Sequence, residues 1–172
     1  MGKGDQSEFT ALVERQSRFV FRVAYAVLLN AADAEDAVQE TFLKLYRSGD
    51  WRAARDERAY LARVAWRVAV DRRRALGRPE DADGEAPEHA TTDADPEARA
   101  MFADRQARVH AMIDALPEEL RMPLVLSAND ELNSREIGET LGIPEGAVRT
   151  RLQRARQMLR QKLATLEEAR YA

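Results

Sequence analysis

The chain has 172 residues, of which 45% are hydrophobic and 33% are charged, and its net charge is −3. This length suits one ordinary domain or two small ones, and the hydrophobic content is enough for real cores, which excludes a disordered chain. The chain has no cysteine and only two histidines, which excludes a disulfide framework, a thiolate nucleophile and a sulfur-ligated metal site, so we expect neither a cofactor nor a metal.

The charge is unevenly distributed. Residues 77–97 contain eight acidic side chains and one basic one, whereas residues 1–76 and 98–172 have net charges of +3 and +1. Both flanks can therefore meet phosphates. The polar first eight residues and the lack of an apolar run of about eighteen residues predict no signal peptide, no membrane insertion and a cytoplasmic protein.

The first third of the chain is typical of paired helices. Residues 9–29 have apolar side chains at the i, i+3, i+4 spacing of an amphipathic helix, and Asn30 is a plausible end. Asp33 is a candidate cap for a second helix, which we expect to run to about Arg47.

A loop and a third helix follow. Residues 48–55 contain a glycine and a tryptophan, and Asp56 is predicted to cap a helix that ends near Arg74. Residues 1–76 are thus expected to form a compact helical domain. Residues 77–98 are rich in acids, proline and glycine and have no large apolar side chain, so we predict a flexible acidic linker.

The remaining residues, 99–172, are predicted to form a second helical domain. An apolar pattern over residues 101–116 predicts one helix, and Pro117 suits the first position of the next. Pro123 is expected to bend that second helix or to remove one hydrogen bond. No alternating strand pattern occurs, so the fold class is all-α.

A helix-turn-helix is predicted near the C-terminus. Asn133 and Glu136 have the spacing of a capping box, which begins a short helix that ends at Gly142. Pro144 is suited to begin the next helix, so two helices are joined by a tight turn. This second helix is strongly basic, with one acidic residue in its first turn.

The basic helix has the residue types that read duplex DNA. Arginine pairs with guanine in the major groove, and other cations contact phosphates and set the register. A solvated arginine-rich face is the alternative, but the capping box and glycine turn favour recognition. We expect four side chains to reach base edges or nearby phosphates: Arg149, Thr150, Gln153 and Arg154. Arg151 and Arg156 are expected to contact phosphates.

With these motifs in place, the chain resembles the extracytoplasmic-function (ECF) sigma factors of the sigma-70 family over nearly its full length. Its segment LPEELRMPLVLSANDELNSREIGETLGIPEGAVRTRLQRARQMLRQKL resembles their region 4. The resemblance implies a non-catalytic protein that directs bacterial core RNA polymerase to promoters, with region 4 on the minus-35 element and on the polymerase beta flap.

The segment DAEDAVQETFLKLYR resembles region 2.2 of that family, which binds the clamp helices of the polymerase beta-prime subunit. By position, the resemblance implies that Asp36, Gln39, Glu40 and Leu43 make these contacts. Helix solubility is the alternative reading of the carboxylates. The resemblance also implies that an anti-sigma factor is a common partner.

The helix over residues 56–74 resembles the element that opens minus-10 DNA. Its face away from the core is expected to expose a tryptophan among arginines, which suits unstacked single strands because rings stack on bases and cations follow phosphates. The expected contacts are Arg63, Trp66, Arg67 and Arg74 in the helix, with Trp51 or Arg52 capturing a base in the preceding loop.

Some positions have a second reading. Trp51 is as consistent with a lid on a small core as with a DNA contact, and the acidic linker is consistent with a plain tether or with a segment that enters the polymerase cleft. Arg67 replaces an asparagine common in the family, and Glu57 replaces an aromatic residue. The minus-10 preference and the mode of strand capture are therefore left open.

Three other functions fit less well. A stand-alone helix-turn-helix regulator leaves the first domain unexplained, and a helical scaffold makes the basic recognition helix accidental. An enzyme would need Asp36 with Glu40, or His110, as its acid or base, yet no nucleophile, phosphate-binding loop or metal set accompanies them.

Overall fold

The computed structural model describes residues 3–77, 96–128 and 132–171. Residues 78–95, which make up most of the predicted linker, lie outside them. The described residues contain helices and no strand, which confirms the all-α class. In chain order they are α1 (Lys3–Leu28), α2 (Ala31–Ser48), the short 3-10 helix η1 (Asp50–Arg52), α3 (Glu57–Ala75), α4 (Pro96–Asp114), α5 (Glu118–Ser127), α6 (Ser134–Leu141) and α7 (Glu145–Tyr171).

The turn between α1 and α2 differs from the prediction. Leu29 has a φ of 51°, which ends α1, and Asn30 caps α2 by accepting a 3.0 Å hydrogen bond from the Asp33 backbone N–H. Asp33 therefore lies in the first turn and is not the cap. A left-handed backbone is costly for leucine, but Leu29 is buried, and this apolar burial offsets the cost.

The loop between α2 and α3 begins and ends with strong local signals. Gly49 has a φ of 70°, and its N–H donates to the carbonyl of Leu45, closing α2. Glycine is suited to this left-handed position because it has no Cβ. Asp56 accepts from the N–H of Ala59 at 3.0 Å, which confirms it as the cap of α3.

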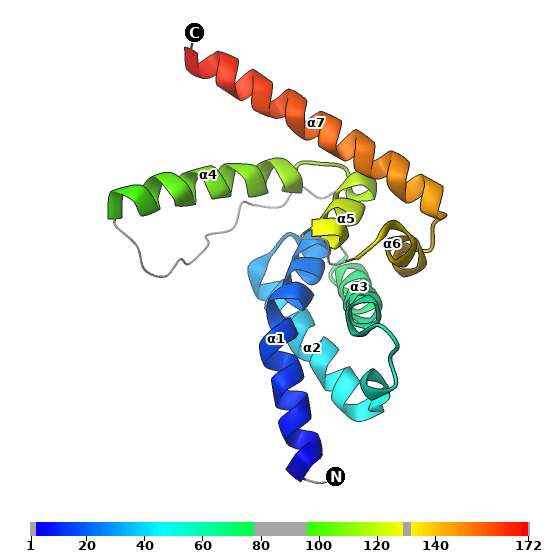
Figure 1. Ribbon diagram of the computed structural model, residues 1–172. Coiled ribbons are helices and arrows are strands. Elements are labelled where there is room, and N and C mark those ends of the chain that lie inside the picture. The colour runs from blue at the N-terminus through cyan, green and yellow to red at the C-terminus, as the bar shows by residue number, and fades with distance from the viewer. Residues whose placement is uncertain (1–2, 78–95, 129–131, 172) are drawn as a thin grey trace.

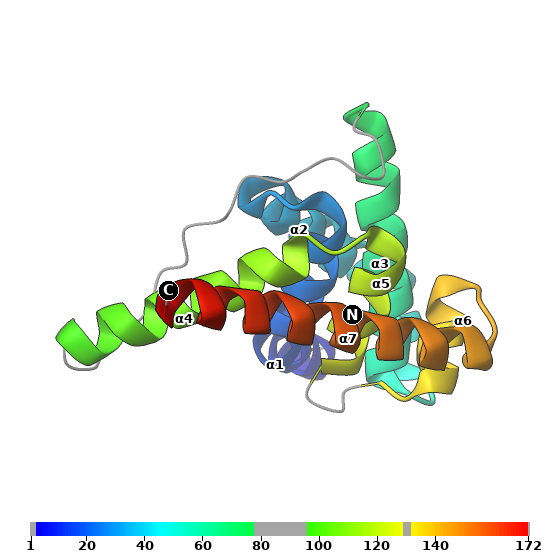
Figure 2. The same cartoon turned by 90° about the horizontal axis from the view of Figure 1, so that it is seen from above.

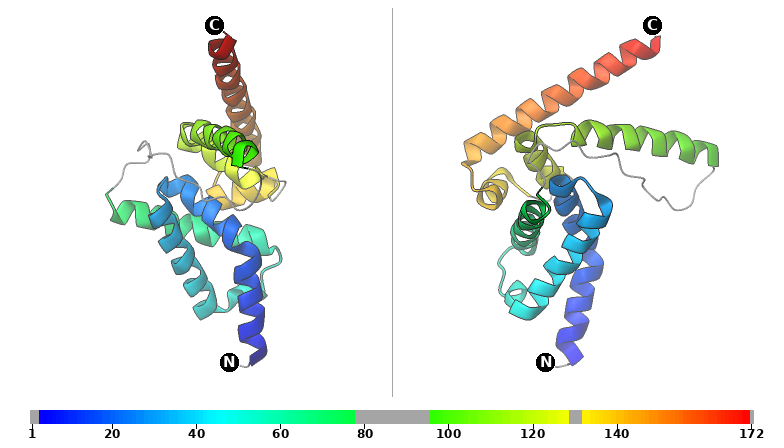
Figure 3. Two further views of the ribbon diagram at one scale, coloured as in Figure 1. Left: turned by 90° about the vertical axis from the view of Figure 1, so that its left-hand side faces the viewer. Right: turned by 180° about the vertical axis from the view of Figure 1, so that it is seen from behind.

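The helices form two groups that lie against each other (Figure 1). Helices α1, α2 and α3 pack together as one group, while α5, α6 and α7 form the other. Viewed from above, α7 runs across α5 (Figure 2). Helix α4 leads into α5 and extends away from the first group, and the N- and C-terminal ends lie at opposite extremes of the molecule (Figure 3).

The two groups share one hydrophobic core. Helix α5 packs against α1, and α6 packs against α3. A single cluster of buried side chains includes Leu12 and Leu61 from the first group together with Leu126, Ile137 and Val148 from the second. This shared core fixes the two groups against each other.

Candidate nucleic-acid interface

The helix-turn-helix has the local geometry that the sequence predicts. Asn133 Oδ1 accepts from the Glu136 N–H at 3.0 Å, and Glu136 Oε2 accepts from the Asn133 N–H at 2.9 Å, which confirms the capping box. Gly142 has a φ of 69° and ends α6. Helix α7 begins at Glu145, with Pro144 just before it rather than inside it.

Helix α6 approaches the turn very closely at Gly138. A Cβ atom placed on Gly138 would lie 2.7 Å from the backbone oxygen of Ile143. The N–H of Ile143 also donates to the Gly138 carbonyl at 3.0 Å. This close contact fixes the angle between the two helices, and only a residue without a side chain fits it.

Helix α7 buries one side and exposes the other. Val148, Leu152 and Ala155 are buried, and at 3.6 residues per turn the opposite side presents Thr150 and Gln153. The exposed side chains expected to contact the minus-35 element are Arg149, Thr150, Gln153, Arg154 and Arg156. Arg149 also forms an ion pair with Glu145 one turn earlier.

Arg151 lies on a different side of α7 and is partly buried. It lines a cavity of about 460 Å³ together with Trp66 of α3, Pro117, Met122 of α5 and Leu141 of α6, and with the carboxylates of Glu118 and Glu119. The structure therefore places Arg151 between the two helical groups and apart from the exposed basic face.

The predicted minus-10 residues of α3 are not all exposed. Arg67 and Arg74 are exposed, and Arg63 is partly buried. Trp66 was expected on the exposed face, but it is partly buried and packs against the hydrophobic clusters of the molecule. Trp66 is partly buried because α5 and α6 cover this side of α3.

Trp51 belongs to the core. Its side chain is 9% exposed, and its ring lies 5.8 Å from that of Phe9, as the core-lid interpretation of this residue expects. The guanidinium of Arg52 lies over the same ring, 4.9 Å from its centroid. The contact of either residue with DNA stays a prediction.

The residues expected to bind polymerase share one face of α2. Asp36, Gln39 and Leu43 are exposed, and Glu40 is partly buried. Leu43 is 47% exposed, although it is a large apolar residue among the polar side chains of this face. Asp36 accepts from Arg72 of α3 at 2.6 Å, and Glu40 pairs with Lys44 at 3.1 Å.

Sequence reasoning missed the polar contacts between the two groups. Arg73 of α3 donates to Glu118 of α5 at 2.6 Å, with side chains only 5% and 14% exposed. Arg121 is buried and donates to three backbone carbonyls: Ala26 near the end of α1, Asp114 at the end of α4, and Leu116 just beyond it. Helix ends favour cations at such carbonyls.

Two further contacts cross the same boundary. The hydroxyl of Tyr25 lies 3.5 Å from an Asp114 carboxylate oxygen, and burial together with that negative charge raises the pKa of Tyr25. Asp56 and Glu136 share a hydrogen bond; this bond raises the pKa of Glu136, while the backbone bond from Ala59 lowers that of Asp56. No single-residue signal in the sequence indicates these pairs.

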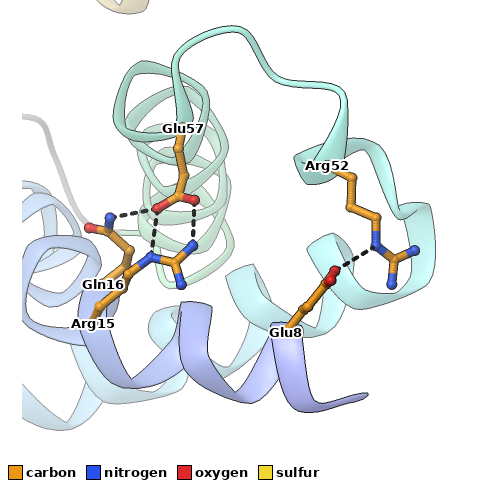
Figure 4. A network of polar contacts seen from close by, with 5 residues as sticks. All are labelled: Glu8, Arg15, Gln16, Arg52 and Glu57. Carbon is orange, nitrogen blue, oxygen red and sulfur yellow. Dashed lines mark hydrogen bonds and ion pairs between the residues drawn. The ribbon is translucent and has the colours of Figure 1, made fainter. Parts of the chain in front are cut away.

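Glu57 connects α3 to α1. Arg15 donates to both of its carboxylate oxygens, at 3.1 and 2.6 Å, and Gln16 donates to one of them at 2.7 Å (Figure 4). These bonds explain why a carboxylate stands at this position. They also lower the pKa of Glu57, chiefly through the Arg15 hydrogen bond.

The described part of the chain contains no group of three or more histidine, aspartate or glutamate side chains placed to hold a metal ion. Within the same residues, no helix combines the length and the apolar character needed to cross a bilayer.

Comparison with known families defines the class of the protein. The model "Sigma-70 region 2" matches residues 12–79, and "Sigma-70, region 4" matches residues 106–159. The solved structure "CnrH in complex with the cytosolic domain of CnrY" is similar with a TM-score of 0.65 and 25% identity, covering 93% of this chain and 90% of that one. RpoE of Bartonella quintana, solved with the anti-sigma factor NepR, shares the fold, with a TM-score of 0.68 at 19% identity over 91% of this chain and 97% of that one.

Curated relatives narrow the class. ECF RNA polymerase sigma factor SigW of Bacillus subtilis is 33% identical over 95% of this chain and 93% of its own length. SigE of Mycolicibacterium smegmatis is 36% identical over 94% of this chain, which spans 65% of that relative's length. The chain belongs to the ECF RNA polymerase sigma factors. It is therefore a transcription initiation factor that directs RNA polymerase to promoters.

Proposed function

We propose that the exposed face of α2 binds the core polymerase, that α3 and the loop before it bind minus-10 DNA, and that α7 binds the minus-35 duplex. In this proposal residues 1–76 and 99–172 are the two functional domains, and residues 77–98 connect them. The protein itself catalyses no reaction and acts in the cytoplasm, where the polymerase is.

The observation that carries the proposal is the geometry of the helix-turn-helix. A capped α6 and a left-handed Gly142 set α7 at a fixed angle, and the exposed side of α7 presents Arg149, Gln153 and Arg154. These residue types at the N-terminal part of a second helix suit the major groove.

The proposal requires the two helical groups to separate on the promoter. The minus-35 and minus-10 elements lie about 25 base pairs apart, or about 85 Å at about 3.4 Å per base pair. In the structure Trp66 of α3 and Arg151 of α7 line the same cavity between the two groups, so these helices are held close together. A chain held in this arrangement cannot contact both elements at once. The packing of α5 on α1 and of α6 on α3, together with the Arg73–Glu118 pair, therefore opens when the promoter binds.

An anti-sigma factor is the second proposed partner. The similar structure of CnrH is a complex with the cytosolic domain of CnrY. We call the arrangement in the structure, with the two helical groups in contact, the closed form. A protein that binds the closed form more tightly than the open form would keep the two DNA surfaces from reaching their elements.

The test is co-elution of the purified chain with bacterial core RNA polymerase in gel filtration, followed by transcription from a genomic promoter library. We expect a stable complex that initiates at promoters sharing two upstream elements. A chain that binds DNA but does not bind active core polymerase at low salt is instead a stand-alone regulator.

A further inference from the structure

The start of α3 is tied to α1 by a surface cluster. Glu57 receives three hydrogen bonds, two from Arg15 and one from Gln16. The Arg15 and Glu57 side chains are 48% and 32% exposed. Ion pairs with this exposure contribute little to folding. The cluster therefore adds little to global stability.

The loop before α3 is also held, at Arg52, by the first turns of α1. Arg52 pairs with Asp5 at 3.0 Å and lies 4.0 Å from Glu8, and Figure 4 shows Glu8 and Arg52 facing each other. Next to Arg52, the ring of Trp51 packs against Phe9 of the same helix. Three parts of the loop region are thus held by the same helix.

The residues of α1 that make these contacts follow helical spacing, so they lie along one side of the helix. That side also contains Leu12, which is fully buried. The contacting residues of α1 are Asp5, Glu8, Phe9, Arg15 and Gln16.

We propose that α1 is a brace that sets the position of residues 49–56, and that Arg15 and Glu57 are positioning residues for the capture of minus-10 DNA by this loop. The inference rests on the proposed function, in which Arg52 and the loop contact that DNA. A loop that is ordered before binding loses less conformational entropy when it binds, and discrimination between bases requires side chains held within a fraction of an ångström.

The brace acts on selectivity more than on affinity for polymerase. Its contacts lie between α1 and the loop, whereas the proposed polymerase surface is the exposed face of α2. Breaking the Arg15–Glu57 pair loosens the start of α3 against α1, so the loop more often samples positions in which correct and incorrect bases are bound more equally.

The experiment measures open-complex formation with core polymerase on a matched promoter and on promoters with single-base changes in the minus-10 element. Glu57→Gln and Arg15→Gln are compared with the wild-type chain and with the charge exchange Arg15→Glu with Glu57→Arg. Asp104→Asn removes an exposed ion pair in α4 and is the matched control. Binding to core polymerase and the urea midpoint are recorded for each variant.

We expect both single variants to lower the ratio of matched to mismatched rates about two- to fivefold, because a pair with this exposure can supply no larger effect, with polymerase affinity unchanged. The charge exchange should restore most of the ratio. Gln16 can support the charge exchange, because its buried amide oxygen meets no donor among the described residues. After an amide flip this oxygen can accept a hydrogen bond from the guanidinium of the arginine introduced at position 57.

Unchanged ratios in both single variants, or no restoration by the charge exchange, overturn the brace. Asp5→Asn removes the partner of Arg52 in the first turn of α1 and keeps the test decisive if Glu57→Gln folds poorly. A wild-type ratio in Asp5→Asn also overturns the brace. Arg52→Ala tests the proposed function separately from the brace. A wild-type ratio in Arg52→Ala overturns the role of Arg52 in reading minus-10 DNA, and the brace with it. A lowered ratio in Arg52→Ala beside wild-type ratios in the Arg15 and Glu57 variants overturns the brace alone.

Discussion

The buried ion pair between Arg73 and Glu118 is the contact whose loss should most directly open the molecule. It joins α3 to α5 across 45 positions of sequence, with an N–O distance of 2.6 Å. Replacing Arg73 with alanine removes the cation and leaves the Glu118 carboxylate with little solvent around it. An unpaired carboxylate in that position favours separation of the two helical groups, because separation exposes it to water.

The magnitude follows from the burial of the two partners. Removing one partner from a deeply buried pair costs about 3–5 kcal/mol. Glu118 keeps 14% of its exposure and lies in the first turn of α5, where the helix dipole favours negative charge. We therefore expect a loss of about 2–3 kcal/mol, which shifts the equilibrium toward the open form about 30- to 140-fold.

The assay uses the absence of cysteine from the chain. Lys44→Cys in α2 and Arg160→Cys in α7 place two labels on exposed positions of different helical groups, and energy transfer between them reports separation. Urea unfolding gives the stability of the same variants. Arg108→Ala removes an exposed pair and is the control, with an expected loss below about 0.5 kcal/mol.

Arg73→Ala should lower energy transfer and speed open-complex formation with core polymerase, because the closed form cannot contact both promoter elements and no longer competes. The double variant Arg73→Met with Glu118→Leu should stay closed, since apolar residues of similar volume replace buried ion pairs at little cost. The reasoning is refuted if Arg73→Ala keeps the wild-type energy transfer and loses less than about 0.5 kcal/mol.

Three other outcomes are expected. Arg149→Ala or Arg154→Ala should cost about 1–3 kcal/mol in binding to the preferred minus-35 duplex and relax its sequence preference; equal effects on all sequences in a binding titration would reduce them to phosphate contacts. Gly138→Ala should lose about 1–3 kcal/mol of unfolding free energy and weaken minus-35 binding, because the new methyl group meets the Ile143 carbonyl at 2.7 Å, and a wild-type melting curve would contradict this. The pKa of Glu57 is lowered in the folded chain. The ionised Glu57 side chain therefore stabilises the fold above its unfolded pKa of about 4.3, and this contribution is lost as the pH falls through the lower folded value. Urea midpoints measured between about pH 6 and 3 should decline less steeply in Glu57→Gln than in the wild-type chain.

Local chemistry explains which parts of the fold could be predicted from the sequence. Asp56 and the Asn133–Glu136 capping box act on backbone groups within three residues, so short sequence windows contain the whole interaction. The wrong prediction of Asp33 as the cap of α2 also arose from a choice between residues only three positions apart. Asn30 three residues earlier is an equally good cap, and the turn at Leu29 decided between them.

The sequence by itself determined the all-α class, the helix-turn-helix and the amphipathic face of each helix, because these depend on periodicity and on neighbours a few residues away. Only the tertiary structure decided which faces are covered. Trp66 lies against the second helical group, Arg73 pairs with α5, and Arg121 reaches a carbonyl 95 positions away. A helical pattern shows that a side is apolar or charged but not which distant helix meets it, so the closed arrangement of the two halves became visible only in three dimensions.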